Sequence, residues 1–191
     1  MTTRFPLLIA ATGLCALVGC VDPRMAPYAT LGDRTAEINE LRAQAEQGNA
    51  KDQYNLGVRY ESGQVVPQDY QEAVRWYRLA AMQGYSDAQY QLCTMSDIGR
   101  GLPQDYQEAL RWCSLAADQY NGRAMYNLGV HYQYARGVSK DLIRAHMWYN
   151  LAAANGYDDG GKWRDRLASD MTPAQIAEAQ KLARESNLNI R

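Results

Sequence analysis

Three successive copies of a 36-residue segment dominate the chain and decide which folds are open to it. Leu56, Leu92 and Leu128 mark one position of the segment, each 36 residues from the next. The same interval relates other identical residues, namely Tyr54/Tyr90/Tyr126, Asp69/Asp105/Asp141, Ala73/Ala109/Ala145, Trp76/Trp112/Trp148 and Ala80/Ala116/Ala152. A fixed period of this length indicates an array of one repeated supersecondary unit.

Each copy predicts a pair of helices. In the first copy, residues 54–60 (YNLGVRY) place apolar side chains at helical spacing, and Gly63 suits a left-handed helix end. Asp69 and Glu72 then form a capping box, in which the aspartate accepts a bond from the first turn and the glutamate reaches back to the aspartate N–H. Residues 73–81 continue as a second helix with one apolar stripe.

This unit resembles the Sel1-like repeat family, a relative of the tetratricopeptide repeat. The resemblance covers roughly residues 36 to 186, and it rests on YNLGVRY (54–60), Gly63, Asp69-Tyr70, AVRWYRLAAMQG (73–84) and their echoes. It implies an all-α fold, a right-handed α-solenoid of antiparallel helix pairs. The predicted repeats are 49–85, 86–121 and 122–157.

The N-terminal segment predicts export and lipidation. Residues 1–19 read as a lipoprotein signal peptide, because Arg4 precedes an apolar run that is shorter than the ~20 residues of a spanning helix. Leu17-Val18-Gly19-Cys20 resembles the bacterial lipobox, so we expect acyl chains, palmitate among them, on Cys20. An ordinary signal peptide cleaved nearby is the alternative. Val21 in place of aspartate resembles the outer-membrane class of lipoproteins in organisms with two membranes.

Segments outside the period predict a tether and two caps. Residues 20–34 contain prolines, glycine and scattered charge, which is typical of a tether between the lipid and the repeats. Residues 35–48 predict an N-terminal capping helix, in which Glu40 replaces the aromatic residue of the period, as a polar outer face requires. Residues 158–191 predict C-terminal capping helices, the last one opening with Thr172-Pro173-Ala174-Gln175. Its apolar stripe would cover the third repeat with Ile176, Ala179 and Leu182.

The middle repeat carries two cysteines that predict a disulfide. Cys93 stands where the other repeats have glycine, and Cys113 stands where they have tyrosine. A hairpin that turns near residue 103 places both at the same height on facing helices. With Cys15 removed in the signal peptide and Cys20 lipidated, no other thiol remains, and an exported protein meets oxidising conditions. Two buried free thiols are the alternative to a Cys93–Cys113 bridge.

Enzyme chemistry finds no support in the sequence. No nucleophile stands at a recognisable distance from a base, and no Ser-x-x-Lys motif, glycine-rich phosphate loop or metal-ligand cluster occurs, so we expect no catalytic residue, no cofactor and no metal. His131 occupies the position of Arg59 and is predicted to be solvated, whereas His146 is predicted to pack. The net charge of −1 offers no electrostatic case for nucleic acid.

The first helices of the repeats predict a partner-binding face. In stacked helix pairs these helices line an extended concave surface. The tetratricopeptide resemblance assigns to that surface Tyr54, Asn55, Val58 and Glu61, then Tyr90, Gln91, Thr94, Asp97 and Ile98, and then Tyr126, Asn127, Val130, Gln133 and Tyr134. The alternative for the recurring tyrosine is a structural role in place of partner binding. A surface of Tyr, Asn and Gln suits a peptide or a polysaccharide strand.

The sequence therefore predicts a non-catalytic scaffold in the bacterial cell envelope. It would be anchored by lipid in the outer membrane, facing the periplasm, where it holds a protein or peptide partner. A binder of glycan or peptidoglycan fragments is the alternative, and a cell-wall or β-lactam hydrolase is the third hypothesis.

Overall fold

The computed structural model describes the backbone of residues 31–189 and the side chains of residues 35–186. Within that range the chain forms nine α-helices and no strand. The predicted signal peptide, Cys20 and most of the predicted tether lie outside the described residues. The described helices are each too short or too polar to span a membrane.

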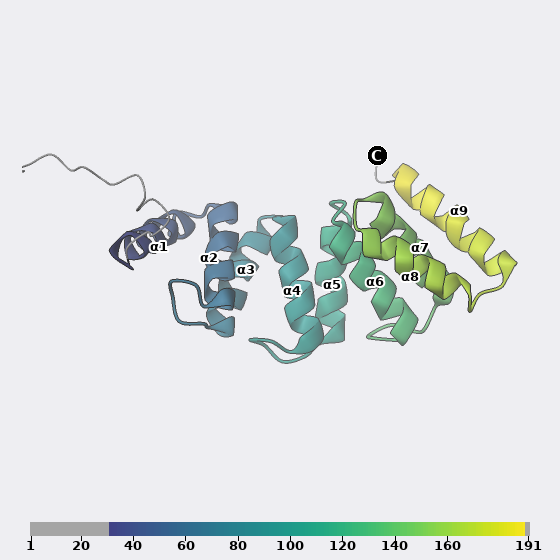
Figure 1. The fold of residues 1–191 in the computed structure, drawn as a ribbon, viewed down its shortest axis with the longest axis horizontal. Coiled ribbons are helices and arrows are strands. Elements are labelled where there is room, and N and C mark those ends of the chain that lie inside the picture. The colour runs from purple at the N-terminus through teal and green to yellow at the C-terminus, as the bar shows by residue number, and fades with distance from the viewer. Residues whose placement is uncertain (1–30, 190–191) are drawn as a thin grey trace, which may run out of the picture.

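The helices follow one another along the long axis of the molecule, from α1 at one end to α9 at the other (Figure 1). Their bounds are α1 Leu31–Glu46, α2 Ala50–Ser62, α3 Tyr70–Met82, α4 Ser86–Ile98, α5 Tyr106–Ala117, α6 Gly122–Tyr134, α7 Leu142–Ala154, α8 Asp158–Ala168 and α9 Pro173–Asn189. The helices pair as α2 with α3, α4 with α5 and α6 with α7, and each pair contacts the next. The predicted solenoid of helix pairs is confirmed.

The apolar stripe of the second helix forms the core. In α3 the stripe residues Ala73, Trp76, Tyr77, Ala80 and Ala81 are all at most 5% exposed. Alanine at three of these positions lets the helices pack closely, Tyr77 packs on Gly57 of the same pair, and Trp76 joins a cluster with Ile38 and Ala45 of α1. The spacing of these residues in the sequence therefore predicts the burial correctly.

Only one half of the capping box at α3 forms. Asp69 Oδ1 accepts hydrogen bonds from the backbone N–H groups of Gln71 (2.9 Å) and Glu72 (3.0 Å), as predicted. The backbone N–H of Asp69, however, donates to the carbonyl of Tyr60 (2.9 Å), which closes the turn between the two helices. The Glu72 carboxylate accepts instead from Arg75 (3.2 Å). The predicted return bond from Glu72 is therefore wrong, because the fold uses that N–H elsewhere.

The N-terminal capping helix α1 is longer at its start than predicted. It begins at Leu31, so residues 31–34 belong to the helix and not to the tether. The nearest proline, Pro27, lies before that point, so no residue without an N–H interrupts the first turn. Ile38 and Ala45 of α1 are buried and join one core cluster with Trp76 of α3.

The C-terminal helices cover the third repeat. At the start of α9 the backbone N–H of Thr172 donates to Gln175 Oε1 (2.9 Å), and Thr172 Oγ1 accepts from the Gln175 N–H (3.3 Å), which is a complete capping box. The helix packs against α7 and buries Ala179 and Ala183, with exposed fractions of 0% and 1%.

His131 is buried, which corrects the prediction that it is solvated. Its side chain is only 1% exposed. The segment after α6 folds back over the ring, so that the carbonyl of Arg136 lies 2.9 Å from His131 Nδ1. Tyr106 of α5 meets the imidazole ring edge-on at 6.2 Å. The equivalent Arg59 instead extends toward Glu37 of α1, a neighbour that exists only at the N-terminal end.

Candidate partner-binding surface

The predicted partner-binding residues lie on α2, α4 and α6, the first helices of the three pairs. We call the side of these helices that carries them the α2–α4–α6 face. All fourteen retain at least partial solvent exposure, and Ile98 and Tyr134 are the most exposed apolar side chains among them, at 48% and 53%. Whether a partner contacts them stays a prediction.

The recurring tyrosine of this face packs against two other tyrosines. The Tyr54 ring centroid lies 5.7 Å from that of Tyr77 and 5.1 Å from that of Tyr85. Tyr126 repeats the arrangement, 5.4 Å from Tyr149 and 5.1 Å from Tyr157. Burial raises the pKa of the Tyr54 and Tyr126 hydroxyls above the usual value. These rings therefore have a structural role, and each is only partly exposed.

A glycine in the first helix makes room for the central tyrosine. A Cβ placed on Gly57 would lie 2.6 Å from Tyr77 Cε1, and Gly129 faces Tyr149 in the same way. The middle repeat replaces this contact with the disulfide between Cys93 and Cys113, whose Cα atoms are 5.2 Å apart. The structure thus contains the predicted pairing, at the place where the other repeats pack tyrosine on glycine.

The end of the face is a network of internal hydrogen bonds. Tyr77 Oη donates to Glu61 Oε2 (2.6 Å), and Tyr149 Oη donates to Gln133 Oε1 (2.6 Å). Gln91 Nε2 also donates to Glu61 Oε2 (3.1 Å). Burial, and then the bond to Glu61, raise the pKa of the Tyr77 hydroxyl. Several predicted contact residues therefore already have partners within the chain, which orders them before anything binds.

Asp97 occupies the equivalent position in the middle repeat but has different partners. Cys113 lacks the hydroxyl with which the equivalent tyrosines donate in the other repeats. Asp97 Oδ2 instead pairs with Arg136 Nη1 at 3.1 Å. Its Oδ1 lies 3.7 Å from His131 Nε2 and has no hydrogen-bond partner among the described residues. Because His131 Nδ1 faces a carbonyl, that nitrogen carries the proton of the neutral ring, and the Nε2 lone pair faces the carboxylate.

Burial lowers the pKa of His131, although the Arg136 carbonyl and the Asp97 carboxylate oppose that shift. The ring is therefore neutral near pH 7. The sequence pattern alone does not predict this cluster, because the residue equivalent to His131 in the first repeat is Arg59, a residue type that is usually solvated. The sequence does contain one pattern that indicates the Asp97–Arg136 pair. Glu61 and Arg100 are separated by the same number of residues as Asp97 and Arg136. In the structure Arg100 Nη1 lies 3.9 Å from Glu61 Oε1, so the ion pair recurs with the period.

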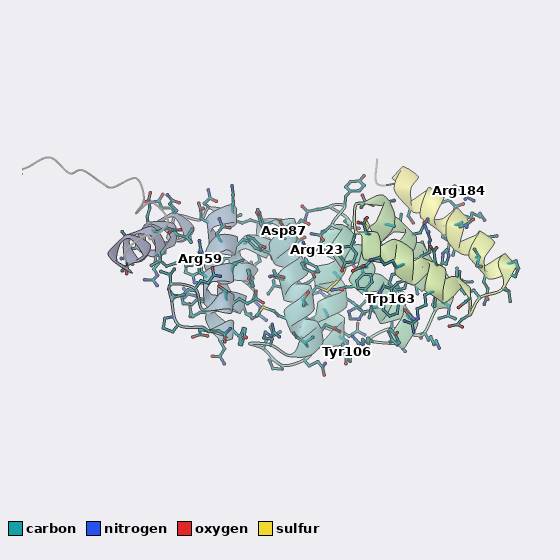
Figure 2. The ribbon with its side chains drawn as sticks, in the orientation of Figure 1. Arg59, Asp87, Tyr106, Arg123, Trp163 and Arg184 are labelled. Carbon is teal, nitrogen blue, oxygen red and sulfur yellow. A yellow bond between two sulfur atoms is a disulfide. The ribbon has the colours of Figure 1, made fainter. Side chains whose placement is uncertain are left out.

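The face continues onto α1, which sequence analysis did not include. A pocket of about 520 Å³ lies between α1 and α2 and is lined by Glu37, Glu40, Leu41, Gln44, Asn55, Val58 and Arg59. Arg59 lies in this region in Figure 2 and pairs with Glu37 at 3.3 Å. Two predicted residues, Asn55 and Val58, thus share a hollow with the acidic side of the capping helix.

The side chains of this face can donate and accept hydrogen bonds and can bury apolar groups. Among the described residues, no group of three His, Cys, Asp or Glu side chains is placed to hold a metal ion. The geometry therefore fits recognition of a ligand by contact and charge.

Comparison with known proteins identifies the repeats. The family model described as Sel1 repeat matches residues 50–85, 86–121 and 122–157. This chain belongs to the Sel1 repeat family. Each matched segment contains one helix pair of the structure, α2–α3, α4–α5 or α6–α7. No curated protein sequence matches this Sel1 repeat protein.

The solved structures that resemble the Sel1 repeat chain include the following two. A protective antigen present in uropathogenic Escherichia coli strains, which displays an SLR fold, is 38% identical with a TM-score of 0.65. The match covers 69% of this chain and 28% of the antigen. A Sel1 repeat protein from Oxalobacter formigenes is 30% identical with a TM-score of 0.67, and the match covers 77% of this chain and 62% of that protein. The chain thus spans less than two thirds of either relative.

Proposed function

We propose that this Sel1 repeat protein is a non-catalytic scaffold that holds a protein or peptide partner on its α2–α4–α6 face. Sel1 repeat proteins typically serve as protein-interaction scaffolds.

The observation that carries the proposal is an ordered polar framework beside exposed apolar side chains. Glu61, Gln91 and Gln133 are held by hydrogen bonds within the chain. Because these side chains are already ordered, a partner that contacts them loses less conformational entropy on binding. Ile98 and Tyr134 remain exposed and can supply the apolar contact area that stabilises a complex. This combination favours an extended peptide or a helix with an apolar anchor residue.

We further propose that the protein works at the bacterial cell envelope, lipidated on Cys20 and facing the periplasm. This part of the proposal rests on the lipobox-like segment 17–20, outside the described residues. A tether of the predicted length would let the solenoid stand clear of the membrane surface.

The test is a photo-crosslinking experiment in cells of the source organism. A photoreactive amino acid replaces Ile98 in one variant and Lys181 in the control variant, since Lys181 is exposed on α9, away from the proposed face. We expect protein adducts from position 98 and none of the same mass from position 181.

Adducts of equal yield at both positions would argue against a specific face. Absence of any protein adduct, together with glycan fragments that co-purify with the protein, would favour the glycan-binding alternative.

A further inference from the structure

The second helices of the repeats leave open clefts between them on another side of the solenoid. The cleft between α5 and α7 has a volume of about 510 Å³, and its apolar lining consists of Leu110, Leu115, Leu128, Tyr132, Val138 and Trp148. We call it the α5/α7 cleft. An equivalent cleft of about 500 Å³ lies one repeat earlier, between α3 and the turn before α5, and contains Leu79. Leu79 and Leu115 are unusually exposed for leucines, at 39% and 45%.

The third repeat shows what covers such a surface. Leu151 lies one period after Leu115 and is only 1% exposed, and its neighbour Met147 is 8% exposed. Helix α9 packs against α7, and its Ala183 joins the core cluster that contains both residues. Ser186 Oγ of α9 lies 3.9 Å from Met147 Sδ. Figure 1 shows α9 beside α7 and α8 at the end of the array. An amphipathic helix with a stripe of small residues is thus the element that closes this surface.

The positive charge in the α5/α7 cleft indicates that its ligand carries a negative charge. Arg111 lines the cleft, and no acidic side chain does so among the described residues. Arg111 also has no ion-pair partner within residues 35–186. In the earlier cleft, by contrast, Arg75 pairs with Glu72 at 3.2 Å and Arg78 pairs with Glu108 at 3.2 Å. Of these two clefts, therefore, the α5/α7 cleft is the one in which an acidic group on an incoming helix would find an unpaired positive charge, at Arg111.

We propose that the α5/α7 cleft binds an amphipathic helix of a second partner protein. That helix presents a narrow stripe of alanine and leucine to Leu110, Leu115 and Trp148, and it carries glutamate or aspartate beside Arg111. The cleft uses another side of α6, which carries Leu128 and Tyr132, and none of the fourteen predicted residues of the α2–α4–α6 face line it, so one molecule can hold two partners at once.

The probe for this site is a synthetic peptide with the sequence of residues 172–187, in which K181E and R184E make the charged side acidic. Arg184, on the exposed part of α9, is labelled in Figure 2. The full chain is labelled at its leucine and methionine methyl groups and titrated with this peptide while NMR spectra are recorded. We expect saturable shifts of the Leu115 and Leu110 methyl signals.

Variants of the protein test separately how the apolar contact and the charge contribute to the affinity for the peptide. Leu115→Glu should weaken the peptide about tenfold, as loss of a central apolar contact does. Met82→Glu is the matched control, since Met82 is 79% exposed and does not line the cleft, and it should leave binding unchanged. Arg111→Glu should weaken binding of the modified, acidic peptide and strengthen binding of the unmodified peptide, which keeps Lys181 and Arg184. Retained peptide affinity in both Leu115→Glu and Arg111→Glu would overturn the proposal.

Two other outcomes would also overturn it. Shifts confined to Met147 and Leu151 would mean that the peptide only exchanges with α9. Concentration-dependent dimers that Leu115→Glu abolishes, without any peptide binding, would make the cleft a contact between two copies of this chain.

Discussion

At the scale of single residues, one exchange in the middle repeat rearranges a whole set of contacts. Cys113 replaces the tyrosine that elsewhere packs on glycine and donates from its hydroxyl to the end of the first helix. The disulfide to Cys93 restores the connection between the two helices, but it leaves Asp97 without that donor. Asp97 instead forms an ion pair with Arg136 and lies beside His131, both in the next repeat.

A first prediction tests this exchange. Cys93→Ala with Cys113→Ala should lower the free energy of unfolding by about 3 kcal/mol, the chain-entropy value for a loop of this length. Cys93→Gly with Cys113→Tyr should recover part of that loss, because it recreates the glycine–tyrosine contact and a hydroxyl donor for Asp97. Urea unfolding of the oxidised parent and both variants measures the two differences. Equal stability of the two variants would contradict the proposed equivalence of the contacts.

A second prediction concerns the buried histidines. Burial lowers the pKa of His131 and His146 below the usual value, so both rings are neutral in the folded state near pH 7. The unfolded chain binds more protons below about pH 6.5. The free energy of unfolding is therefore unaffected by protonation of the two histidines above that pH, and it falls as the pH drops below it, because protons then bind preferentially to the unfolded chain. We expect the free energy of unfolding to decrease between pH 7 and pH 5.

His146→Leu isolates one of the two contributions. His146 Nδ1 is buried without a hydrogen-bond partner among the described residues, and the equivalent residues of the other repeats are Val74 and Leu110. The substitution should raise stability at pH 7 by about 1 kcal/mol and flatten the pH dependence. Urea unfolding at several pH values checks both effects, and an unchanged pH profile would show that other groups dominate it.

At the scale of helices, the three first helices end in the same backbone conformation with different residues. Gly63 and Gly99 take left-handed φ values of 70° and 69° after α2 and α4. Ala135 takes φ 55° after α6, where its Cβ is unfavourable. The fold imposes this conformation because the chain must turn back to place Asp141 at the start of α7, where its N–H bonds to the Tyr132 carbonyl.

The third prediction follows from that strain. Ala135→Gly should raise the free energy of unfolding by about 1 kcal/mol, since glycine adopts positive φ without a steric cost. Gly63→Ala is the reciprocal control and should destabilise, because its Cβ would also meet Gln68 Cβ at 3.1 Å. Thermal and urea unfolding measure both. A destabilised Ala135→Gly variant would mean that the alanine methyl group makes a contact worth more than the strain.

At the scale of the whole molecule, the same polar contact joins successive units of the array. Gln53 Nε2 of the first repeat donates to the Ala45 carbonyl of the capping helix α1 (3.1 Å), and one period later Gln89 Nε2 of the second repeat donates to the Ala81 carbonyl of the first repeat (3.1 Å). Stability of such an array depends on interfaces between neighbours and on caps at both ends. Helices α1 and α9 supply those caps, and α9 also covers the apolar side of α7 that the earlier repeats leave open.

The fourth prediction concerns attachment of the whole molecule to a membrane. Cys20→Ala should move the protein from the membrane fraction to the soluble fraction, because several acyl chains on one cysteine anchor a protein firmly. Fractionation of cells that express the parent and the variant at equal levels is the measurement. Continued tight membrane association of the variant would contradict lipidation at this cysteine.

Much of the fold was determined by the sequence alone. The period, the helix pairs, the buried stripe from Ala73 to Ala81 and the capping helices all follow from local patterns that recur at 36-residue intervals. The Cys93–Cys113 pair could also be predicted, because two positions changed together in one copy while the other copies showed what each normally contacts.

Only the tertiary structure decided how the surface residues are used. The Tyr77 hydroxyl on α3 donates to Glu61, and the turn after α6 folds back over His131 and buries it, so neither outcome follows from the identity of the residue alone. Leu79, Leu115 and Leu151 are identical and equally spaced, yet α9 buries only the last. The physical reason is that exposure depends on which elements pack alongside, and the helix that makes this difference lies outside the period.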